Sequence, residues 1–276
     1  MRVAFLGPAG TFTEEALRTS APAGPVEELP YPTVYETVMA VHNGDVDRAV
    51  VPIENSLEGS VNATLDTLAG EAADVRIARE VVLPIRHCLI ARDGTSIEDV
   101  TRVISHPQAV SQCARFLHER LPSAQRGTVG STAEAVQRVA ESDEPWAAIG
   151  SRISAELYGC RLLADGIEDH AGNETRFVWL APHDAPPEPG ESKTSLVFWG
   201  FNDESPGALV GVLAELANRD INLTKIESRP RRMQLGHYMF FADLEGAEGD
   251  PVVAEALEAL RARVAELRVL GSYPAA

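Results

Sequence analysis

The sequence predicts a mixed α/β protein whose two blocks are joined by a short linker. Before residue 182, apolar runs typical of strands alternate with amphipathic patterns typical of helices, as in sheets that are covered by helices. After residue 192 the order changes, because two strand-like runs follow one another without a helix between them. With 276 residues, 45% of them hydrophobic, the chain can bury a sizeable core in each block.

Five apolar runs bounded by polar or turn-forming residues predict strands in the upstream block, over residues 3–6, 49–53, 103–105, 147–149 and 177–180. Apolar spacing predicts helices over 108–121 and 132–141. Pro107 fits the first position of the earlier helix, and Ser131 with Glu134 can cap the later one. We expect the amino termini of these helices to point free N–H groups toward the strand ends.

Residues 77–90 predict a crossover between two lobes. An Arg-Glu-Val-Val-Leu-Pro stretch interrupts this run, which then resumes as a strand. If the strand over 177–180 returns to the first lobe, each lobe has its own sheet and a cleft lies between them. We accordingly assign 1–76 and 165–181 to the first lobe and 77–164 to the second.

Residues 182–192 hold four prolines and a glycine without any buried-face periodicity, which is typical of a linker. The block after it, 193–272, predicts strand, helix, strand, strand, helix and strand, over 194–201, 207–218, 222–227, 237–243, 252–265 and 267–270. This is the βαββαβ order of a ferredoxin-like α+β fold. Leu209, Leu213 and Leu216 are spaced to bury one face of the first helix, so packing alone explains them.

Composition excludes several classes of function. The formal net charge of -17 argues against a surface that binds nucleic acid or an anionic membrane. Cys88, Cys113 and Cys160 lie far apart without CxxC spacing, so we expect neither a metal site nor a disulfide framework. Residues 3–6 are too few for a signal peptide, and no apolar run approaches the roughly 18 residues that span a bilayer. We expect a soluble, cytoplasmic protein.

Four short polar clusters each follow an apolar run of the upstream block, at residues 7–11, 54–56, 105–108 and 173–176. Open α/β sheets bind ligands just beyond the carboxyl ends of their strands, so loops far apart in sequence can meet around one small polar molecule. We therefore expect these clusters to form one crevice.

Six sequence motifs in series resemble those of monofunctional prephenate dehydratase with a carboxy-terminal ACT regulatory domain. They are GPAGTFTEEA (7–16), PIENSLEGSV (52–61), SHPQAVSQC (105–113), TRF (175–177), PGALVGVL (206–213) and INLTKIESRP (221–230). The resemblance covers nearly the whole chain, and it implies a two-lobed catalytic domain like a periplasmic binding protein, with the active site in the interlobe cleft. Because Met1 leads directly into the first predicted strand, we expect the form without a chorismate mutase segment.

The reaction that the resemblance implies is consistent with an active site in the interlobe cleft. Prephenate loses carbon dioxide and hydroxide together to give phenylpyruvate, and the formation of an aromatic ring supplies the driving force. The enzyme has to hold a dianion and to offer a hydrogen bond to the leaving hydroxyl, and such a donor can be worth about 2.7–4 kcal/mol. Neither a metal nor an organic cofactor is required or expected.

By family likeness, catalysis is assigned to Thr175, with Asn55, Ser105 and Gln112 in support. The hydroxyl of Thr175 does not ionise near neutral pH, so we interpret it as an oriented hydrogen-bond donor rather than a full acid. Substrate binding is assigned to four further residues, namely Thr11, Ser56, Gln108 and Arg176.

Local sequence leaves simpler interpretations open for these residues. Asn55 can form a turn, Thr175 is a residue type common at the start of a strand, and Ser105 can cap the following helix. Thr11 can likewise be a helix cap, and Gln112 can be solvated.

Arg176 has two candidate partners of different kinds. Its guanidinium can bind a substrate carboxylate through two parallel hydrogen bonds, or it can pair with Glu54 or Glu58. His106 precedes a proline at a helix start, and we interpret it as a loop or cap residue.

For the second block, the resemblance implies an allosteric site for phenylalanine, the end product, between neighbouring subunits of a homo-oligomer, a dimer or a tetramer. Local sequence allows residues 227–230 to be a strand end before a basic turn that contains Arg229, Arg231 and Arg232. The residues at the family positions of the effector site are Gly207, Ala208, Leu209, Asn222, Glu227 and Ser228.

Two other functions stay open at this point. Arogenate differs from prephenate by an amino group in place of the side-chain keto oxygen, and the sequence does not separate the two dehydratases. A module that only senses an aromatic ligand would bind without turnover.

Overall fold

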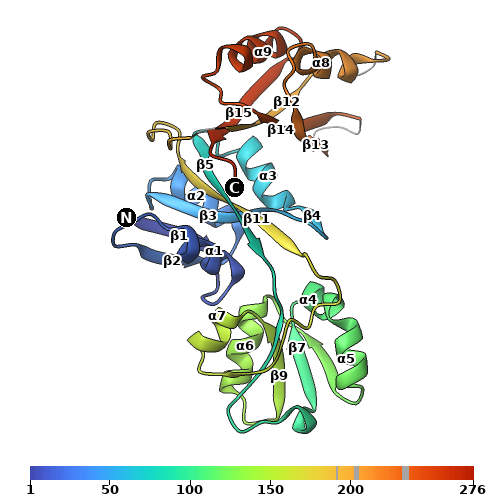
Figure 1. Cartoon of the computed structure of the whole chain (residues 1–276). Helices are drawn as coiled ribbons and strands as arrows, with labels where there is room; N and C mark the ends of the chain where they lie inside the picture. Colours follow the sequence, from blue (N-terminus) through green and yellow to red (C-terminus); the bar gives the residue numbers. More distant parts are fainter. Residues whose placement is uncertain (191, 202–204, 232–235) are drawn as a thin grey trace. The chain divides into compact units, whose positions relative to one another are not determined.

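The computed structural model describes residues 1–190, 192–201, 205–231 and 236–276. Contact density divides the described chain into two compact units, one of residues 1–37, 50–61 and 82–177 and the other of residues 38–49, 62–81 and 178–276. The described strands form three separate sheets, which confirms the mixed α/β class (Figure 1).

The first sheet has the order β2 (Glu27–Tyr31), β1 (Arg2–Leu6), β3 (Arg48–Asn55), β11 (Glu174–Pro182) and β5 (Val75–Pro84), with β4 (Gly59–Ser60) paired to the end of β3. Its connections contain α1 (Phe12–Ser20), α2 (Val34–His42) and α3 (Asn62–Ala69). The runs 3–5 and 49–51 are fully or almost fully buried, as expected for inner strands covered on both faces. The strand predicted over 177–180 does return to this sheet, as part of β11.

The second sheet has the order β10 (Arg161–Asp165), β6 (Cys88–Ala91), β9 (Trp146–Gly150), β7 (Arg102–Ser105) and β8 (Gln125–Thr128). Its connections include η1 (Ile97–Asp99), α4 (Pro107–Gln112), α5 (Ala114–Arg120), α6 (Thr132–Glu141) and α7 (Arg152–Leu157). The crossover predicted over 77–90 is confirmed, because β5 belongs to the first sheet and β6 to the second.

Helices cover both faces of this second sheet. Alternate side chains of a strand point to opposite faces, and β6 follows this rule: Leu89 packs in the same core as Leu117 of α5, whereas Ile90 packs in the same core as Val136 of α6. Figure 1 shows α4 and α5 on one side of β7 and β9, with α6 and α7 on the other.

The prediction of a single helix over 108–121 is wrong. The helix is interrupted at Cys113 (φ -114°, ψ 19°), which separates α4 from α5. The cause is a tertiary contact. The backbone N–H of Asp169 donates to the carbonyl of Gln112 at 2.7 Å, and the Asp169 carboxylate accepts from the backbone N–H of Arg115 at 3.0 Å. Gln112 therefore lies at the last position of α4.

The predicted helix starts are confirmed with one difference. Pro107 is the first residue of α4, and the hydroxyl of Ser131 accepts from the backbone N–H of Glu134 at 3.0 Å. The Glu134 carboxylate accepts from the N–H of Gly130 at 2.9 Å. The cap of α4 is His106 and not Ser105.

The third sheet has the order β13 (Leu223–Pro230), β14 (Tyr238–Glu245), β12 (Lys193–Trp199) and β15 (Glu266–Tyr273), and each strand runs antiparallel to its neighbours. Helices α8 (Ala208–Ala217) and α9 (Pro251–Arg261) share one core with this sheet, in which Phe198, Leu216 and Leu257 are almost fully buried. The predicted βαββαβ order is confirmed.

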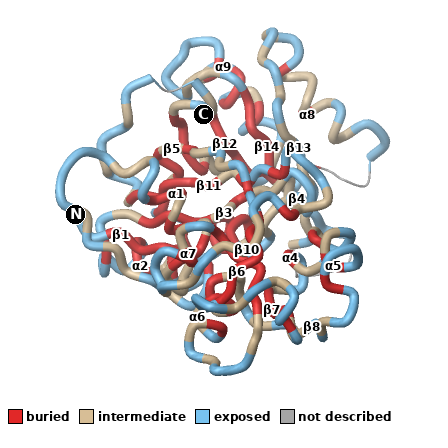
Figure 2. Tube along the Cα trace, turned by 60° about the horizontal axis from the view of Figure 1, so that its bottom comes forward, coloured by how far each residue is buried: buried red, intermediate tan, exposed pale blue. Residues whose placement is uncertain are grey.

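Buried residues are concentrated in the strands of all three sheets and on the helix faces that cover them (Figure 2). Among the described helices, none is both long and apolar enough to cross a bilayer.

Candidate functional site

Two adjacent strand ends bring Asn55 and Thr175 together. Asn55 is the last residue of β3, and Thr175 is the second residue of the neighbouring β11. Nδ2 of Asn55 donates to Oγ1 of Thr175 at 2.8 Å and to Oδ1 of Asn173 at 2.7 Å. Since the end of one strand meets the beginning of the next, the two run antiparallel. The cluster at 173–176 therefore opens its strand, whereas the sequence pattern suggested that it follows one.

The orientation of the Asn55 amide follows from backbone donors. The N–H groups of Leu57 and Glu58 donate to Oδ1 of Asn55 at 2.9 Å and 3.0 Å. A backbone N–H can only donate, so the oxygen and nitrogen of this amide are not interchangeable. Oγ1 of Thr175 is consequently an acceptor for Asn55, and its own hydrogen is donated to no acceptor in the described part of the chain.

Gln112 joins the same network through Asn173. Nδ2 of Asn173 donates to Oε1 of Gln112 at 3.2 Å, and Nε2 of Gln112 donates to Oε1 of Glu58 at 3.3 Å. Nε2 of His87 lies 3.0 Å from the same Oε1 atom of Gln112. The structure thus brings together Asn55, Thr175 and Gln112, which the family motifs singled out.

Asn173 and His87 are two members of the network that the sequence did not assign. Asn173 belongs to the polar cluster at 173–176, so its position gave a usable signal. His87 is a lone histidine in the crossover between β5 and β6, and no motif marks it. Both side chains are 3% exposed.

Ser56 supports the start of β11. Its hydroxyl accepts from the backbone N–H of Glu174 at 3.0 Å, and its own N–H donates to the carbonyl of Glu174 at 2.9 Å. Ser56 therefore holds the backbone next to Thr175.

Ser105 makes a different contact. It is fully buried at the end of β7, and its hydroxyl donates to the carbonyl of Ile149 at 2.6 Å. It is hydrogen-bonded to a strand of the second sheet and not to Asn55, Gln112 or Thr175.

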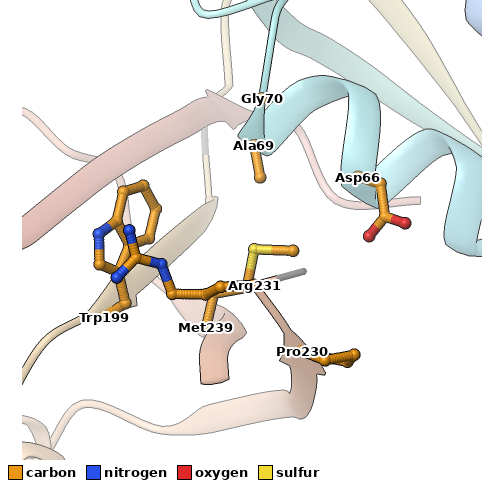
Figure 3. Close-up of a pocket in the computed structure, with 7 residues that line it drawn as sticks. All are labelled: Asp66, Ala69, Gly70, Trp199, Pro230, Arg231 and Met239. Carbon is orange, nitrogen blue, oxygen red and sulfur yellow. The ribbon is translucent and has the colours of Figure 1, made fainter. Parts of the chain in front are cut away.

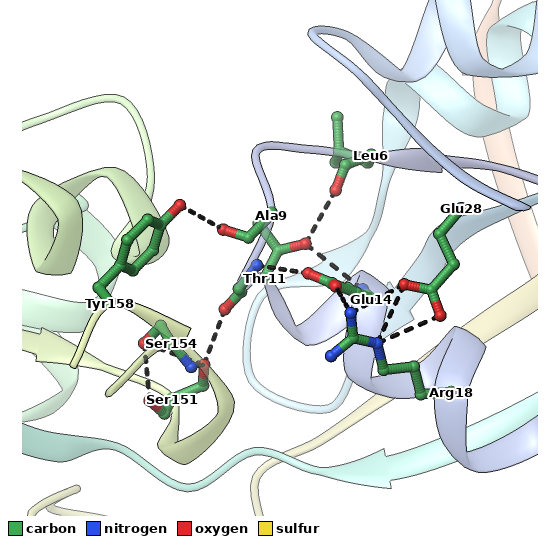
Figure 4. A network of polar contacts seen from close by, with 10 residues as sticks. Leu6, Ala9, Thr11, Glu14, Arg18, Glu28, Ser151, Ser154 and Tyr158 are labelled. Carbon is green, nitrogen blue, oxygen red and sulfur yellow. Dashed lines mark hydrogen bonds and ion pairs between the residues drawn. The ribbon is translucent and has the colours of Figure 1, made fainter. Parts of the chain in front are cut away.

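Thr11 caps helix α1, which is the simpler of its two interpretations. Its hydroxyl donates to the carbonyl of Leu6 at 2.9 Å and accepts from the N–H of Glu14 at 3.4 Å (Figure 4). The hydrogen and one of the two acceptor positions of the hydroxyl are thus engaged. Gln108 is exposed, and within the described residues its side chain takes no part in the Asn55 network.

The loop over residues 7–11 is held by two residues that flank α7. The hydroxyl of Tyr158 donates to the carbonyl of Ala9 at 2.9 Å, and the hydroxyl of Ser151 donates to the carbonyl of Gly10 at 2.9 Å (Figure 4). Gly10 has φ +87°, and a Cβ there would lie 3.0 Å from that of Ser154. Glycine suits this close approach because it has no side chain.

Arg176 pairs with Glu54, one of the partners considered from the sequence. Its Nη2 lies 3.1 Å from Oε2 of Glu54, and the Arg176 side chain is 11% exposed. Successive side chains of a strand alternate, so Arg176 and Thr175 project from opposite faces of β11.

Burial governs the ionisation of the groups near the network. Desolvation lowers the pKa of the His87 imidazole, with the Gln112 hydrogen bond and the Glu168 charge acting in the opposite direction. Burial also raises the pKa of the Cys88 thiol to about 12 and that of Cys113 still further. His87 is therefore neutral and both thiols are protonated at neutral pH. No group of three or more His, Cys, Asp or Glu side chains among the described residues is arranged to hold a metal ion.

The predicted effector residues fall into two groups. Gly207, Ala208 and Leu209 line a cavity of about 370 Å³ together with Tyr238 and Phe240. Gly207 has φ +81° and precedes the first residue of α8, so the backbone N–H groups at the start of this helix border the cavity.

The remaining effector residues lie along β13 and before it. Ser228 pairs with Phe240 and Glu227 with Phe241. Nδ2 of Asn222 donates to Glu245, which is at the opposite end of β14 from Tyr238. A strand rises about 3.4 Å per residue, so these two ends are roughly 24 Å apart. One copy of the chain does not gather all six residues around one small molecule.

A second cavity, of about 250 Å³, lies between α3 and the third sheet (Figure 3). The guanidinium of Arg231 lies over the ring of Trp199, 5.0 Å from its centroid. Arg232, which the sequence places in the same basic turn, lies outside the described residues. The lining residues are Asp66, Ala69, Gly70, Trp199, Pro230, Arg231 and Met239.

Two arginines of the third sheet hold α3 beside this cavity. Arg229 donates to both carboxylate oxygens of Asp66, at 2.9 Å and 2.8 Å. Nη1 of Arg268 donates to the carbonyl of Ala69, the last residue of α3, at 2.9 Å. Cations stabilise the carboxyl end of a helix, so these contacts fix the helix that follows β4 in the chain.

Known proteins resemble this chain over its whole length. The family model described as prephenate dehydratase matches residues 3–185, and the model described as ACT domain matches residues 196–262. The prephenate dehydratase of Mycolicibacterium vanbaalenii is 42% identical over 286 residues, which cover 99% of this chain and 90% of that protein. The bifunctional chorismate mutase/prephenate dehydratase of Neisseria gonorrhoeae is 41% identical over 278 residues, which cover all of this chain and 75% of that protein.

Two solved structures cover this chain completely. The prephenate dehydratase from Arthrobacter aurescens, solved in complex with L-Phe, has a TM-score of 0.91 at 39% identity, with 90% of that chain covered. GqqA, described as a novel type of quorum quenching acylase, has a TM-score of 0.89 at 32% identity, with 98% of that chain covered.

Proposed function

Since this chain belongs to the prephenate dehydratase family and carries an ACT domain, we propose that it converts prephenate to phenylpyruvate. The observation that carries the proposal is the bond from Asn55 to Thr175, because it orients the Thr175 hydroxyl and leaves its hydrogen for another acceptor. The oxygen that leaves the substrate ring is such an acceptor.

The reaction breaks two bonds that join the substrate ring to its substituents, and it makes no bond to the protein. The carbon–carboxylate bond breaks and releases carbon dioxide, its electron pair enters the ring, and the carbon–hydroxyl bond breaks on the other side. The departing hydroxide takes up a proton and becomes water. A hydrogen bond that strengthens as charge grows on the departing oxygen lowers the barrier, and a single donor of this kind contributes about 2.7–4 kcal/mol.

We assign the following roles on this basis. Thr175 donates to the departing oxygen, and Asn55 holds the Thr175 hydroxyl in the donating orientation. The NH2 group of Gln112 donates to a substrate oxygen, and Ser56 holds the backbone at the start of β11. Ser105 holds the end of β7, directly before α4, through its hydrogen bond to the carbonyl of Ile149. Direct contacts of Thr11, Gln108 and Arg176 with the substrate stay predictions.

Purified protein tests the proposal directly. With prephenate we expect phenylpyruvate, and with arogenate we expect slower turnover. Binding of prephenate without product would instead identify a sensing module. Faster turnover of arogenate than of prephenate would assign the chain to arogenate dehydration.

The acylase relative adds a control to this experiment. Burial raises the pKa values of Cys88, Cys113 and Cys160, so their thiols do not supply a thiolate nucleophile at neutral pH. We therefore expect no thiol-dependent cleavage of an acylated substrate under conditions in which prephenate is turned over.

The ACT domain is proposed to bind phenylalanine between two copies of the chain and to inhibit the reaction. Gly207 lies near the Tyr238 end of β14 and Asn222 near its Glu245 end, and this separation supports a site completed by a second copy. The L-Phe complex of the Arthrobacter relative supports phenylalanine as the ligand. The cavity beside α8 suits an amino acid, because helix N–H groups bind a carboxylate and Phe240 and Tyr238 offer apolar surface. Calorimetric titration with phenylalanine, with the molar mass measured in parallel, tests both points.

The proposed function also includes the domain boundaries and the cellular location of the protein. The two family matches support a catalytic domain that ends near residue 181 and a regulatory domain that begins near residue 193. The net charge of -17 and three cysteines without a disulfide support a cytoplasmic protein that binds neither nucleic acid nor membrane.

A further inference from the structure

The hydrogen-bond network at Thr175 has a direction that can be followed from residue to residue. It starts at the backbone N–H groups of Leu57 and Glu58, which make Oδ1 of Asn55 an acceptor and its Nδ2 a donor. Oδ1 of Asn173 accepts from that nitrogen, so Nδ2 of Asn173 is a donor. Oε1 of Gln112 must accept from Asn173, and it follows that the amide orientation of Gln112 is also defined.

The same reasoning defines the tautomer of His87. Its Nε2 lies 3.0 Å from Oε1 of Gln112, which is an acceptor, so Nε2 must carry the hydrogen. Nδ1 of His87 is buried without a hydrogen-bond partner among the described residues, which is consistent with a bare ring nitrogen and not with a buried N–H group.

The backbone of His87 is held by two hydrogen bonds. Its backbone N–H donates to the carboxylate of Glu168 at 3.0 Å, and its carbonyl accepts from the N–H of Ile167 at 3.0 Å. The rings of Phe12 and His87 pack in a T-shaped arrangement, with 5.8 Å between their centroids and 76° between their planes. His87 is therefore a fixed, neutral donor behind Gln112.

From this geometry we propose that His87 is a positioning residue for the dehydration proposed above. It donates to Oε1 of Gln112 and so keeps the NH2 group of Gln112 on the exposed side of the network, next to Glu58, where that group can donate to a substrate oxygen. Without the Nε2 donor, Oε1 of Gln112 would keep only Asn173 as a donor, at 3.2 Å, while the amide nitrogen keeps its bond to Glu58 at 3.3 Å. The inference rests on the proposed function, because the donated hydrogen bond matters only for a substrate that Gln112 binds.

Two amide substitutions separate positioning from packing. In His87→Gln the side-chain nitrogen reaches the position of Nε2, whereas in His87→Asn it reaches only the position of Nδ1. We expect His87→Gln to keep kcat/KM for prephenate within about twofold of the wild type and His87→Asn to lose about fivefold, since a hydrogen bond contributes about 1 kcal/mol and each 1.4 kcal/mol is a factor of ten. Equal rates for the two variants, with similar melting temperatures, would overturn the proposal.

A double-mutant cycle adds a readout that a packing role does not move. In a Gln112→Leu background, His87→Asn should change kcat/KM by less than twofold, because there is no amide left to position. The same loss in both backgrounds would show that His87 acts elsewhere. If His87→Asn does not fold, the comparison of His87→Gln with His87→Leu in the two backgrounds gives the same test. A wild-type protein without turnover of prephenate would refute the proposed function itself, whereas an active wild type with equal variants refutes only the role of His87.

Discussion

Nδ2 of Asn55 donates to Oγ1 of Thr175 across 2.8 Å, between the last residue of one strand and the second residue of its neighbour. The bond gives the Thr175 oxygen its acceptor function and leaves the hydroxyl hydrogen for a different partner. The chemistry assigned to Thr175 thus depends on an amide 120 positions away in the sequence.

Replacement of Asn55 by aspartate tests this dependence. The carboxylate can still accept from Leu57 and Glu58, but it loses the N–H donor to Thr175 and adds negative charge where a dianion has to bind. We expect kcat/KM for prephenate to fall by about a hundredfold to a thousandfold. The melting temperature should fall as well, because the new carboxylate oxygen faces the Asn173 and Glu174 oxygens that accepted from Nδ2. Steady-state kinetics and thermal unfolding of the same preparation measure both quantities, and an Asn55→Asp enzyme with nearly full activity contradicts the role.

The neutral state of His87 predicts a dependence of stability on pH. Its pKa in the folded protein is lowered by burial, so the unfolded chain takes up a proton that the folded chain does not. The free energy of unfolding that His87 contributes is complete above about pH 6.5, the ordinary value for imidazole, and is lost as the pH falls from there through the lowered folded-state value.

Denaturant unfolding of the wild type and of His87→Gln measures this contribution. Between about pH 6.5 and pH 5, the wild type should lose more stability than the variant, by up to about 1.4 kcal/mol per pH unit. Two curves that stay parallel over this interval would show that the His87 imidazole titrates alike in the folded and unfolded chain.

Close packing of β15 against β5 predicts that position 271 tolerates no side chain. A Cβ on Gly271 would lie 2.9 Å from the backbone nitrogen and carbonyl carbon of Ile77 and closer still to its carbonyl oxygen. We expect Gly271→Ala to cost about 1–3 kcal/mol of unfolding free energy, because the backbone has to move. Gly249→Ala is the matched control, since a Cβ at residue 249 has no atom within 4 Å. Equal midpoints in chemical denaturation would contradict the packing.

The sequence was sufficient to predict the α/β class, the βαββαβ block and the residues of the motifs, but it did not predict β2, β8 and β10 of the first two sheets. Strand-like runs, the crossover over 77–90 and the βαββαβ block depend on local periodicity, which short windows contain. Asn55, Gln112 and Thr175 were recognisable through the series of motifs that contain them, and the structure joins them in one network through Asn173.

The remaining features depend on contacts that no short window contains. The break at Cys113 arises from Asp169, which is far along the chain, so apolar periodicity predicted one continuous helix. His87 has a role only because that break ends α4 at Gln112 and places its amide beside the imidazole. Ser105 was correctly placed at a strand-to-helix junction, but its side chain bonds to Ile149 and leaves the cap to His106.

The turnover of prephenate by two variants of Thr175 tests the central claim most directly. Thr175→Ser keeps the hydroxyl donor, and Thr175→Val keeps the shape without it. With melting temperatures near that of the wild type, we expect Thr175→Ser to retain a substantial part of kcat and Thr175→Val to lose about a hundredfold to a thousandfold. A Thr175→Val enzyme that releases phenylpyruvate as fast as Thr175→Ser would contradict the account.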